Sequence, residues 1–304
     1  MVEARGLVKR FADVTAVDGV DILVEEGEIY GLLGPNGAGK TTTIRMICGL
    51  IKPTKGEIRV FGYRMPRDRI KASRLIGYVT QNTSLYEDLT VYENLMFYAS
   101  VYGLKGSERR RAVEETLDRF MLREFRDKMV GKLSGGTVKR VSLAVSMVHS
   151  PRLLILDEPT AGIDPMLRRM FWEMFRELSR EGLTLLVTTH YMDEAENCDR
   201  ISLMLNGKIV ATGTPEEIKR IGMGGEVVEV SFRKPASEGD IRRVGGVKYV
   251  EWVGGEGVKA RVVVEDAEGF LSRLLKAEWL DVAVAGKADV SLEEAFLRIQ
   301  GAQP

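Results

Sequence analysis

Continuous apolar runs alternate with amphipathic stretches along the first two thirds of the chain. The runs at residues 28–33, 153–157 and 183–190 are typical of strands in a parallel sheet that is covered on both faces. Residues 57–61 predict a further strand, and 41–50 predict a helix that stops near Gly49. Residues 201–213 favour a hairpin with a tight turn at Asn206-Gly207.

The segment from 83 to 132 has helical periodicity instead. Thr90 and Glu93 form a capping box ahead of apolar positions at Val91, Leu95 and Ala99. A second helix is expected to open on Ser107, with one apolar side made by Val113, Leu117, Phe120 and Met121. These patterns predict a helical insertion between strands.

Composition shifts after Ile221, and the stretch GMGGE at 222–226 favours a linker. Beyond it the pattern predicts strands at 227–233, 247–253, 259–264 and 281–284, with helices at 238–244, 267–276 and 292–299. The βαββαβ order is typical of a small ferredoxin-like α+β domain. We therefore expect two domains, 1–221 and 222–304.

Composition narrows the function classes. Hydrophobic residues make up 44% of the 304, and 44 basic residues balance 44 acidic ones, so no basic excess points to nucleic acid as a partner. Cys48 and Cys198 lie in apolar surroundings without C-x-x-C spacing, which favours buried free thiols. The charged N-terminus and the lack of an apolar run near the roughly 20 residues of a spanning helix predict a soluble chain without a signal peptide.

A phosphate-binding loop follows the first buried strand. It fits G-x-x-x-x-G-K-[ST] and consists of Gly34, Pro35, Asn36, Gly37, Ala38, Gly39, Lys40 and Thr41. Glycines let backbone N–H groups turn toward an anion, and the helix that follows directs its positive dipole end at the phosphates. Lys40 is expected to reach the β- and γ-phosphates, and the Thr41 hydroxyl to bind Mg²⁺.

Two carboxylates end the strand at 153–157. Asp157 is expected to hold the metal, and Glu158 to polarise an attacking water. Ser134, with Gly135 and Gly136 after it, fits an N-cap and a further row of backbone donors. Taken alone, the segment Ser134 to Gly136 is as compatible with an ordinary capped helix as with a functional site.

Single polar residues end two other strands. His190 follows the strand at 183–190, at the strand end where ligands bind in open α/β sheets, so we interpret it as functional. Gln81 precedes the insertion and could contact both nucleotide and insertion, although a lone Gln proves little. His149 has no such support and is interpreted as structural.

Together these motifs resemble the ATP-binding subunit of an ABC transporter over residues 1–220. The order is Walker A at Gly34–Thr42, the Gln81 loop, the signature LSGGT, Walker B LLILDE, the D-loop AGID and the switch His190. The resemblance implies a P-loop fold with a mixed sheet core, an antiparallel β subdomain and a helical subdomain. It also implies that Phe11 stacks on adenine, that Thr42 and Asp164 belong to the nucleotide site, and that Gln81 serves catalysis and the metal.

What the family implies is a head-to-tail dimer that binds two ATP molecules with Mg²⁺, each between the Walker A loop of one subunit and the signature loop of the other. The partners implied are a second copy or a paralogue and a separate transmembrane permease, which would hold the chain on the cytoplasmic face of the cell membrane. Tyr86 or Leu89 would receive the permease. An alternative is a soluble ABC ATPase that acts on ribosomes or DNA.

Two residues depart from the family pattern, and the final segment resembles one branch of the family. Thr137 replaces the usual Gln of the signature, and Ala161 replaces a frequent Ser of the D-loop. Neither change touches Lys40, Asp157 or Glu158, so we expect a competent ATPase. The ending DVSLEEAFLRIQG at 289–301 resembles ATP-binding subunits of drug, lipid or polysaccharide exporters.

Overall fold

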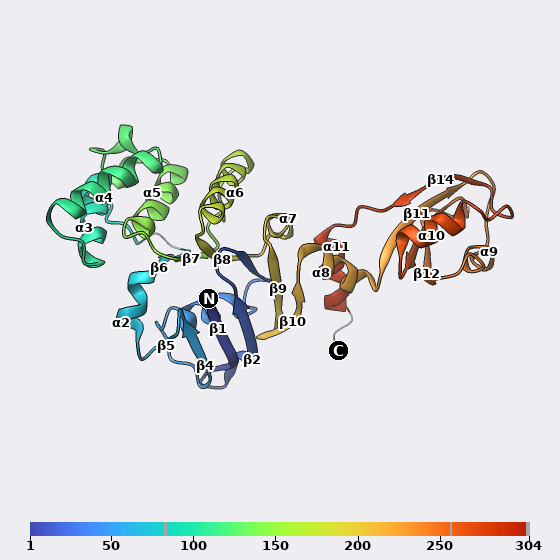
Figure 1. The fold of residues 1–304 in the computed structure, drawn as a ribbon, viewed down its shortest axis with the longest axis horizontal. Helices are drawn as coiled ribbons and strands as arrows, with labels where there is room; N and C mark the ends of the chain where they lie inside the picture. The colour runs from blue at the N-terminus through green and yellow to red at the C-terminus, as the bar shows by residue number, and fades with distance from the viewer. Residues whose placement is uncertain (82–83, 256, 302–304) are drawn as a thin grey trace. The chain divides into compact units, whose positions relative to one another are not determined.

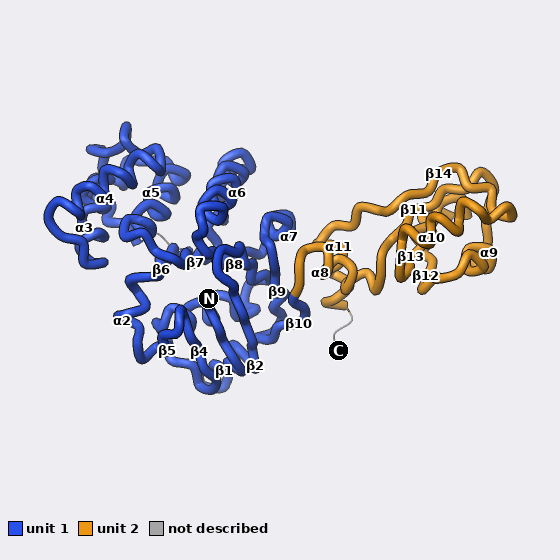
Figure 2. The backbone as a smooth tube through the Cα atoms, in the orientation of Figure 1, with its two compact units in different colours: residues 1–212 blue, residues 213–304 orange. Residues whose placement is uncertain are grey.

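A computed structural model describes residues 1–81, 84–255 and 257–301, and the chain forms two compact units (Figures 1 and 2). Unit 1 is Met1–Thr212 and unit 2 is Gly213–Pro304, so the division precedes the expected boundary at 221. The linker predicted at 222–226 is wrong at its start. Gly222 and Met223 belong to helix α8 (Pro215–Met223), which ends at Gly224 in a left-handed conformation.

A six-stranded sheet, in the order β10-β9-β3-β8-β7-β6, forms the centre of unit 1. Its strands are β3 (Ile29–Leu33), β6 (Ile76–Val79), β7 (Leu153–Asp157), β8 (Thr184–Thr189), β9 (Arg200–Leu205) and β10 (Lys208–Gly213). The pairs from β6 to β9 are parallel. Every residue of β3, β7 and β8 is buried, as the continuous apolar runs predicted. The carboxyl ends of these three strands therefore meet at one edge.

A second, antiparallel sheet of unit 1 has the order β2-β1-β4-β5. Its strands are β1 (Val2–Phe11), β2 (Val14–Val24), β4 (Lys55–Val60) and β5 (Tyr63–Met65). Buried residues of β1, β2 and β4 share one core with helix α1 (Lys40–Ile47) and the central sheet. This core fixes the start of α1, and with it the loop that leads into the helix.

The remaining helices of unit 1 are α2 (Arg69–Ala72), α3 (Val91–Val101), α4 (Gly106–Arg119), α5 (Gly135–Met147), α6 (Pro165–Arg180) and α7 (Met192–Ala195), with 3-10 turns at Ser73–Leu75, Arg123–Phe125 and Val130–Lys132. The Thr90–Glu93 capping box is confirmed. Ser107 does not open α4, which begins at Gly106. Met121 is 54% exposed because it follows the end of that helix, so its predicted place on the apolar side is wrong. Residue 83, the expected start of the insertion, lies outside the described residues.

Unit 2 contains the predicted βαββαβ order. Its elements after α8 are β11 (Glu226–Phe232), α9 (Glu238–Arg242), β12 (Val247–Trp252), β13 (Lys259–Val264), α10 (Ala267–Leu274), β14 (Val282–Lys287) and α11 (Leu292–Gly301). The sheet order β12-β13-β11-β14 is antiparallel throughout, as in a ferredoxin-like sandwich. Ion pairs tie α11 to the sheet, with Arg261 Nη1 3.0 Å from Glu294 Oε1 and Arg298 Nη2 2.7 Å from Glu251 Oε2.

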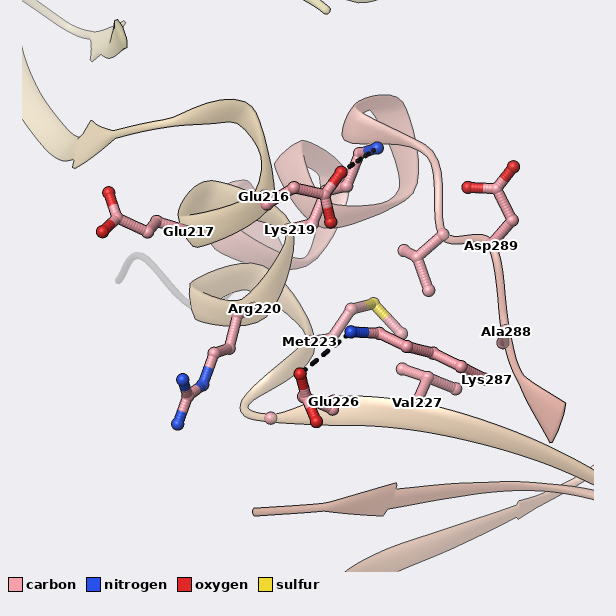
Figure 3. A pocket seen from close by; sticks show the side chains of 12 residues that line it. Glu216, Glu217, Lys219, Arg220, Met223, Glu226, Val227, Lys287, Ala288 and Asp289 are labelled. Atoms are coloured by element: carbon pink, nitrogen blue, oxygen red, sulfur yellow. Dashed lines mark hydrogen bonds and ion pairs between the residues drawn. The ribbon is translucent and has the colours of Figure 1, made fainter. Parts of the chain in front are cut away.

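A cavity of about 280 Å³ opens beside α8 in unit 2 (Figure 3). Met223, Val227 and Val290 give it an apolar lining. Two ion pairs occupy its charged rim, Lys219–Glu216 and Lys287–Glu226, each at 3.0 Å. Contacts within unit 2 thus satisfy these rim charges.

Replacement of Gly222 by Ala is expected to destabilise unit 2. A Cβ at residue 222 would lie 2.7 Å from the Ala295 Cα of α11, which is closer than packed carbons approach. We expect a loss of about 1–3 kcal/mol in the free energy of unfolding, measured by urea denaturation. Gly239→Ala in α9 is the matched control, since its Cβ would meet nothing closer than 3.6 Å. Equal stability of the two variants would contradict the packing argument.

Candidate nucleotide-binding site

The glycine loop lies between β3 and α1, as its motif predicted. Gly34, Gly37 and Gly39 have φ values of 153°, 82° and 107°, which disfavour other residues. A Cβ at Gly39 would also lie 2.5 Å from the Ala16 carbonyl oxygen, so β2 approaches the loop closely. Asn36 and Gly37 are exposed, so the turn can present their backbone N–H groups to an anion, while the exposed Pro35 has no such donor.

Lys40 is the buried cation of the site. Its side chain is 4% exposed, and Nζ donates to the carbonyls of Gly34 at 2.7 Å and Pro35 at 3.1 Å. Nζ also lies 3.5 Å from Glu158 Oε1. Burial lowers the pKa of Lys40, while the charge of Glu158 opposes this shift. Lys40 thus holds a desolvated positive charge beside the loop, where its attraction for phosphate is weakly screened.

Asp157 lies between the loop and β8. Its Oδ1 accepts hydrogen bonds from Thr41 Oγ1 at 3.1 Å and Thr188 Oγ1 at 2.7 Å. Hydroxyl and carboxylate oxygens are the ligands that Mg²⁺ prefers, so the pair Thr41 and Asp157 fits that ion. The fold thus brings these two candidate ligands side by side.

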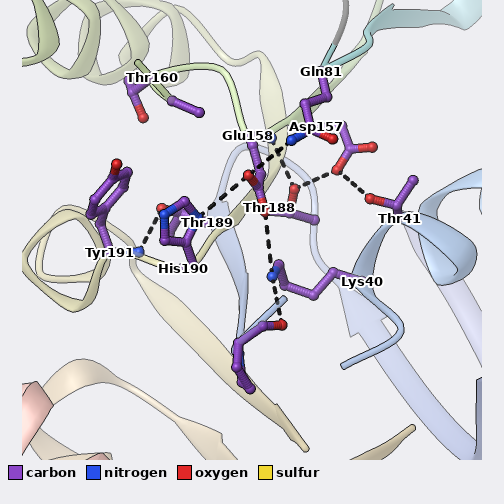
Figure 4. Close-up of polar contacts among 12 residues, drawn as sticks. Lys40, Thr41, Gln81, Asp157, Glu158, Thr160, Thr188, Thr189, His190 and Tyr191 are labelled. Atoms are coloured by element: carbon purple, nitrogen blue, oxygen red, sulfur yellow. Dashed lines mark hydrogen bonds and ion pairs between the residues drawn. The ribbon is translucent and has the colours of Figure 1, made fainter. Parts of the chain in front are cut away.

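Glu158 is the hub of the polar contacts in Figure 4. Its N–H donates to Thr188 Oγ1 at 3.0 Å, and the residue has a φ of 50°, a conformation uncommon outside glycine. Gln81 Nε2 donates to Glu158 Oε2 at 3.4 Å. His190 Nδ1 also lies 3.4 Å from Oε2, without hydrogen-bond geometry. Three predicted residues, Lys40, Gln81 and His190, therefore converge on the carboxylate of a fourth, Glu158.

The signature and D-loop residues begin helices. Ser134 is the N-cap of α5 and accepts from Thr137 N, as predicted, and Thr137 Oγ1 lies 2.9 Å from Ser134 Oγ. Asp164 is the N-cap of α6. Phe11 is 48% exposed, with Lys9 over its ring. Among the described residues, no hydrogen bond or ion pair joins Ser134, Asp164 or Phe11 to Lys40, Asp157 or Glu158.

The other predicted loop residues lie in the glycine loop or at the starts of α1 and α5. Ala38 is buried, Thr42 lies in the first turn of α1, and Gly135 and Gly136 form the first turn of α5. Gly136 faces Leu167 of α6 so closely that a Cβ would overlap the leucine side chain. Both cysteines are buried free thiols, and burial raises their pKa values. None of the helices in the described part of the chain is long and apolar enough to cross a membrane.

Sequence reasoning missed Thr188. It bonds both Asp157 and the backbone of Glu158 from the neighbouring strand. The signal was present, because two threonines follow the apolar stretch Leu185–Val187 directly before His190.

His149 is structural, as predicted. Its ring stacks on Tyr102 with centroids 3.5 Å apart, and Nε2 lies 3.2 Å from the Ile76 carbonyl oxygen. Its Nδ1 is buried and has no hydrogen-bond partner in the part of the chain that the structure describes. Burial lowers the pKa of His149 from 6.5 to about 4.

Acidification is therefore expected to destabilise the fold through His149. The unfolded chain takes up a proton near pH 6.5 and the folded chain near pH 4, so this contribution is fully present above about pH 6.5 and is lost as the pH falls toward 4. Between pH 7.5 and 5, the wild type should lose about 2 kcal/mol more unfolding free energy than His149→Phe. Urea unfolding at both pH values measures the difference, and identical losses would contradict the assignment.

Comparisons with known proteins identify the same family throughout. The ABC transporter family model matches residues 17–161. The chain is 45% identical over 219 residues to the probable multidrug ABC transporter ATP-binding protein YbhF of Escherichia coli, which covers 72% of this chain and 38% of that protein. It is 37% identical over 301 residues to Nod factor export ATP-binding protein I of Burkholderia orbicola, covering 99% of this chain and 97% of the relative.

Solved structures agree. An ATP-binding subunit of an ABC transporter has a TM-score of 0.66 and 32% identity, covering 72% of this chain and 92% of that one. The ATP-binding cassette MJ0796, described as dimeric in a post-hydrolysis state with ADP and Pi, has a TM-score of 0.65 and 27% identity, covering 70% and 98%. These relatives favour a transporter ATPase over one that acts on ribosomes or DNA. The chain belongs to the family of ABC transporter ATP-binding proteins, whose members are ATPases coupled to transport.

Proposed function

We propose that this chain hydrolyses ATP by in-line attack of water on the γ-phosphate and that Glu158 activates the water. The observation that carries the proposal is the convergence of Lys40, Gln81 and His190 on the Glu158 carboxylate beside the glycine loop. Lys40 stabilises the charge of the β- and γ-phosphates, and His190 holds the γ-phosphate. Thr41, Asp157 and Gln81 would hold magnesium, which when bound neutralises phosphate charge.

We further propose that the working unit is a head-to-tail pair of such chains. Ser134 and Gly135 begin α5, whose N-terminus can bind an anion, yet among the described residues no hydrogen bond or ion pair joins them to Lys40 or Glu158. A second chain that presents this N-terminus would complete the site, together with Gly136 and Asp164. The exposed Phe11 ring would stack on adenine. The dimeric form of MJ0796 supports this arrangement.

The transport partner is proposed to be a separate transmembrane permease. A relative that aligns over nearly the whole chain is named for Nod factor export, which supports export as the direction. The chain would then lie on the cytoplasmic face of the membrane through its partner. Tyr86 is 49% exposed and stacks edge-to-face on Phe97, and it offers an aromatic surface for that partner.

Affinity purification of the intact chain from solubilised cells, followed by mass spectrometry, tests the proposed partner. We expect recovery of a membrane protein with several spanning helices, in a complex whose ATP hydrolysis exceeds that of the isolated chain. The balance of 44 basic and 44 acidic residues gives little attraction for nucleic acid. Recovery with ribosomes or DNA instead of a membrane protein would overturn the proposal.

A further inference from the structure

A buried carboxylate lies behind the catalytic cluster. Glu194 of α7 is 1% exposed, although a carboxylate loses much hydration free energy on burial unless it is fully paired. Its Oε1 accepts from Thr160 Oγ1 at 2.6 Å, and its Oε2 accepts from Thr189 Oγ1 at 2.7 Å. Arg168 Nε of α6 lies 3.3 Å from Oε1. The two carboxylate oxygens therefore bind two different segments of the chain.

Those two segments carry Glu158, to which we assign activation of the water, and His190, to which we assign binding of the γ-phosphate. Thr160 follows Glu158 by two residues, in the turn that leads to Asp164, and Thr189 directly precedes His190. The Thr189 hydroxyl also accepts from the backbone N–H of Tyr191 at 3.0 Å (Figure 4). This bond links the residues that precede and follow His190. Arg168 additionally lies over the Tyr191 ring at 4.2 Å.

The signature helix reaches the same turn. Lys139 Nζ of α5 donates to the Pro159 carbonyl at 3.1 Å and to the Ala161 carbonyl. Burial lowers the pKa of Lys139, and the charges of Glu194 and Glu158 oppose that shift. The turn at residues 159–161 is thus held on one side by α5 and on the other by Glu194.

We propose that Glu194 is a positioning residue for hydrolysis, which clamps the segment after Glu158 to the segment before His190 so that the two side chains keep one relative geometry. The inference rests on the proposed function, and it adds a residue that does not touch the nucleotide. The clamp matters because a misplacement of about 1 Å at a reacting group can cost roughly 100-fold in rate. Glu158 Oε2 and His190 Nδ1 are 3.4 Å apart, so a small shift of either strand end alters their alignment.

Removing single hydroxyl groups tests the clamp without cutting a cavity. In Thr160→Val and Thr189→Val, a methyl group replaces the hydroxyl and ends one hydrogen bond to Glu194. Thr189→Val also ends the bond from Tyr191 N–H, so Thr160→Val is the cleaner test of the clamp. We expect kcat for ATP hydrolysis to fall roughly 10- to 100-fold, with KM and the Kd for a non-hydrolysable ATP analogue within about 2-fold of wild type. Thr160→Ser and Thr189→Ser keep the hydroxyl and should retain most of kcat.

Two further variants separate positioning from stability. Thr116→Val removes another buried hydroxyl hydrogen bond, to Ala112 O of α4, and should leave kcat unchanged. Glu194→Gln keeps the side-chain volume but has only one acceptor oxygen, so it loses the bond from one of the two threonines and should be about as slow as a single valine variant. If Glu194→Gln fails to fold, the valine and serine variants at Thr160 and Thr189 are enough to test the positioning role.

Three results would overturn the inference. These are wild-type kcat in both valine variants, an equal loss in the serine and valine variants, or a loss of kcat that only follows a loss of analogue affinity. Glu158→Gln is measured in parallel. If Glu158→Gln is inactive while the valine variants are fully active, the clamp alone is wrong. If Glu158→Gln turns over normally, the proposed function fails instead.

Discussion

Replacement of Glu158 by Gln is expected to lower kcat for ATP hydrolysis by at least about 100-fold while ATP binding is retained. A positioned general base contributes roughly 10²–10⁴ to a rate, and an amide cannot take the proton. Gln has nearly the same size, so the contacts with Gln81 and Lys40 lose charge but little volume. Because hydrolysis no longer removes the triphosphate, ATP-bound dimers should accumulate.

Steady-state phosphate release and equilibrium ATP binding check this result on one preparation. Glu173→Gln, on the exposed face of α6, is the control and should match the wild type in both assays. Normal turnover in Glu158→Gln would assign the base to another residue.

Replacement of Lys40 by Ala is expected to weaken ATP binding by at least about 100-fold. Lys40 is the buried cation beside the loop, and hydrogen bonds to charged groups contribute about 1.5–3 kcal/mol each. Two such bonds to phosphate oxygens correspond to about 3–6 kcal/mol, or more than a factor of 100. The variant also leaves Glu158 without its cation, which adds to the repulsion of phosphate.

Calorimetric titration with a non-hydrolysable ATP analogue measures that loss. Lys71→Ala, on the exposed surface of α2, should bind as the wild type does. Full affinity in Lys40→Ala would contradict the assignment of residues 34–41 as the phosphate loop.

The strands that carry the site could be predicted because nearly all of their residues are apolar. The run Leu153–Asp157 matches β7 residue for residue, since a strand buried on both faces has no polar position inside it. The Ser134 and Thr90 caps were equally clear, because their signal lies within four residues.

The features that were missed depend on distant segments or on irregular geometry. Strand β1 has register shifts after Ala4 and Leu7, which break the alternation that a strand normally shows. Gly222 was interpreted as part of a linker, although its small size serves the contact of α8 with α11. Thr160, Thr189 and Glu194 are separated in sequence, and only the fold brings their oxygens together.

The central claim is that two chains must close on shared ATP. Light scattering of Glu158→Gln, with the permease partner present and with it absent, tests this most directly. With saturating Mg-ATP we predict twice the mass of one chain, or two copies in each permease complex. Adding Lys40→Ala to Glu158→Gln should abolish this ATP-dependent doubling of the mass. A chain that stays single under every one of these conditions would contradict the account.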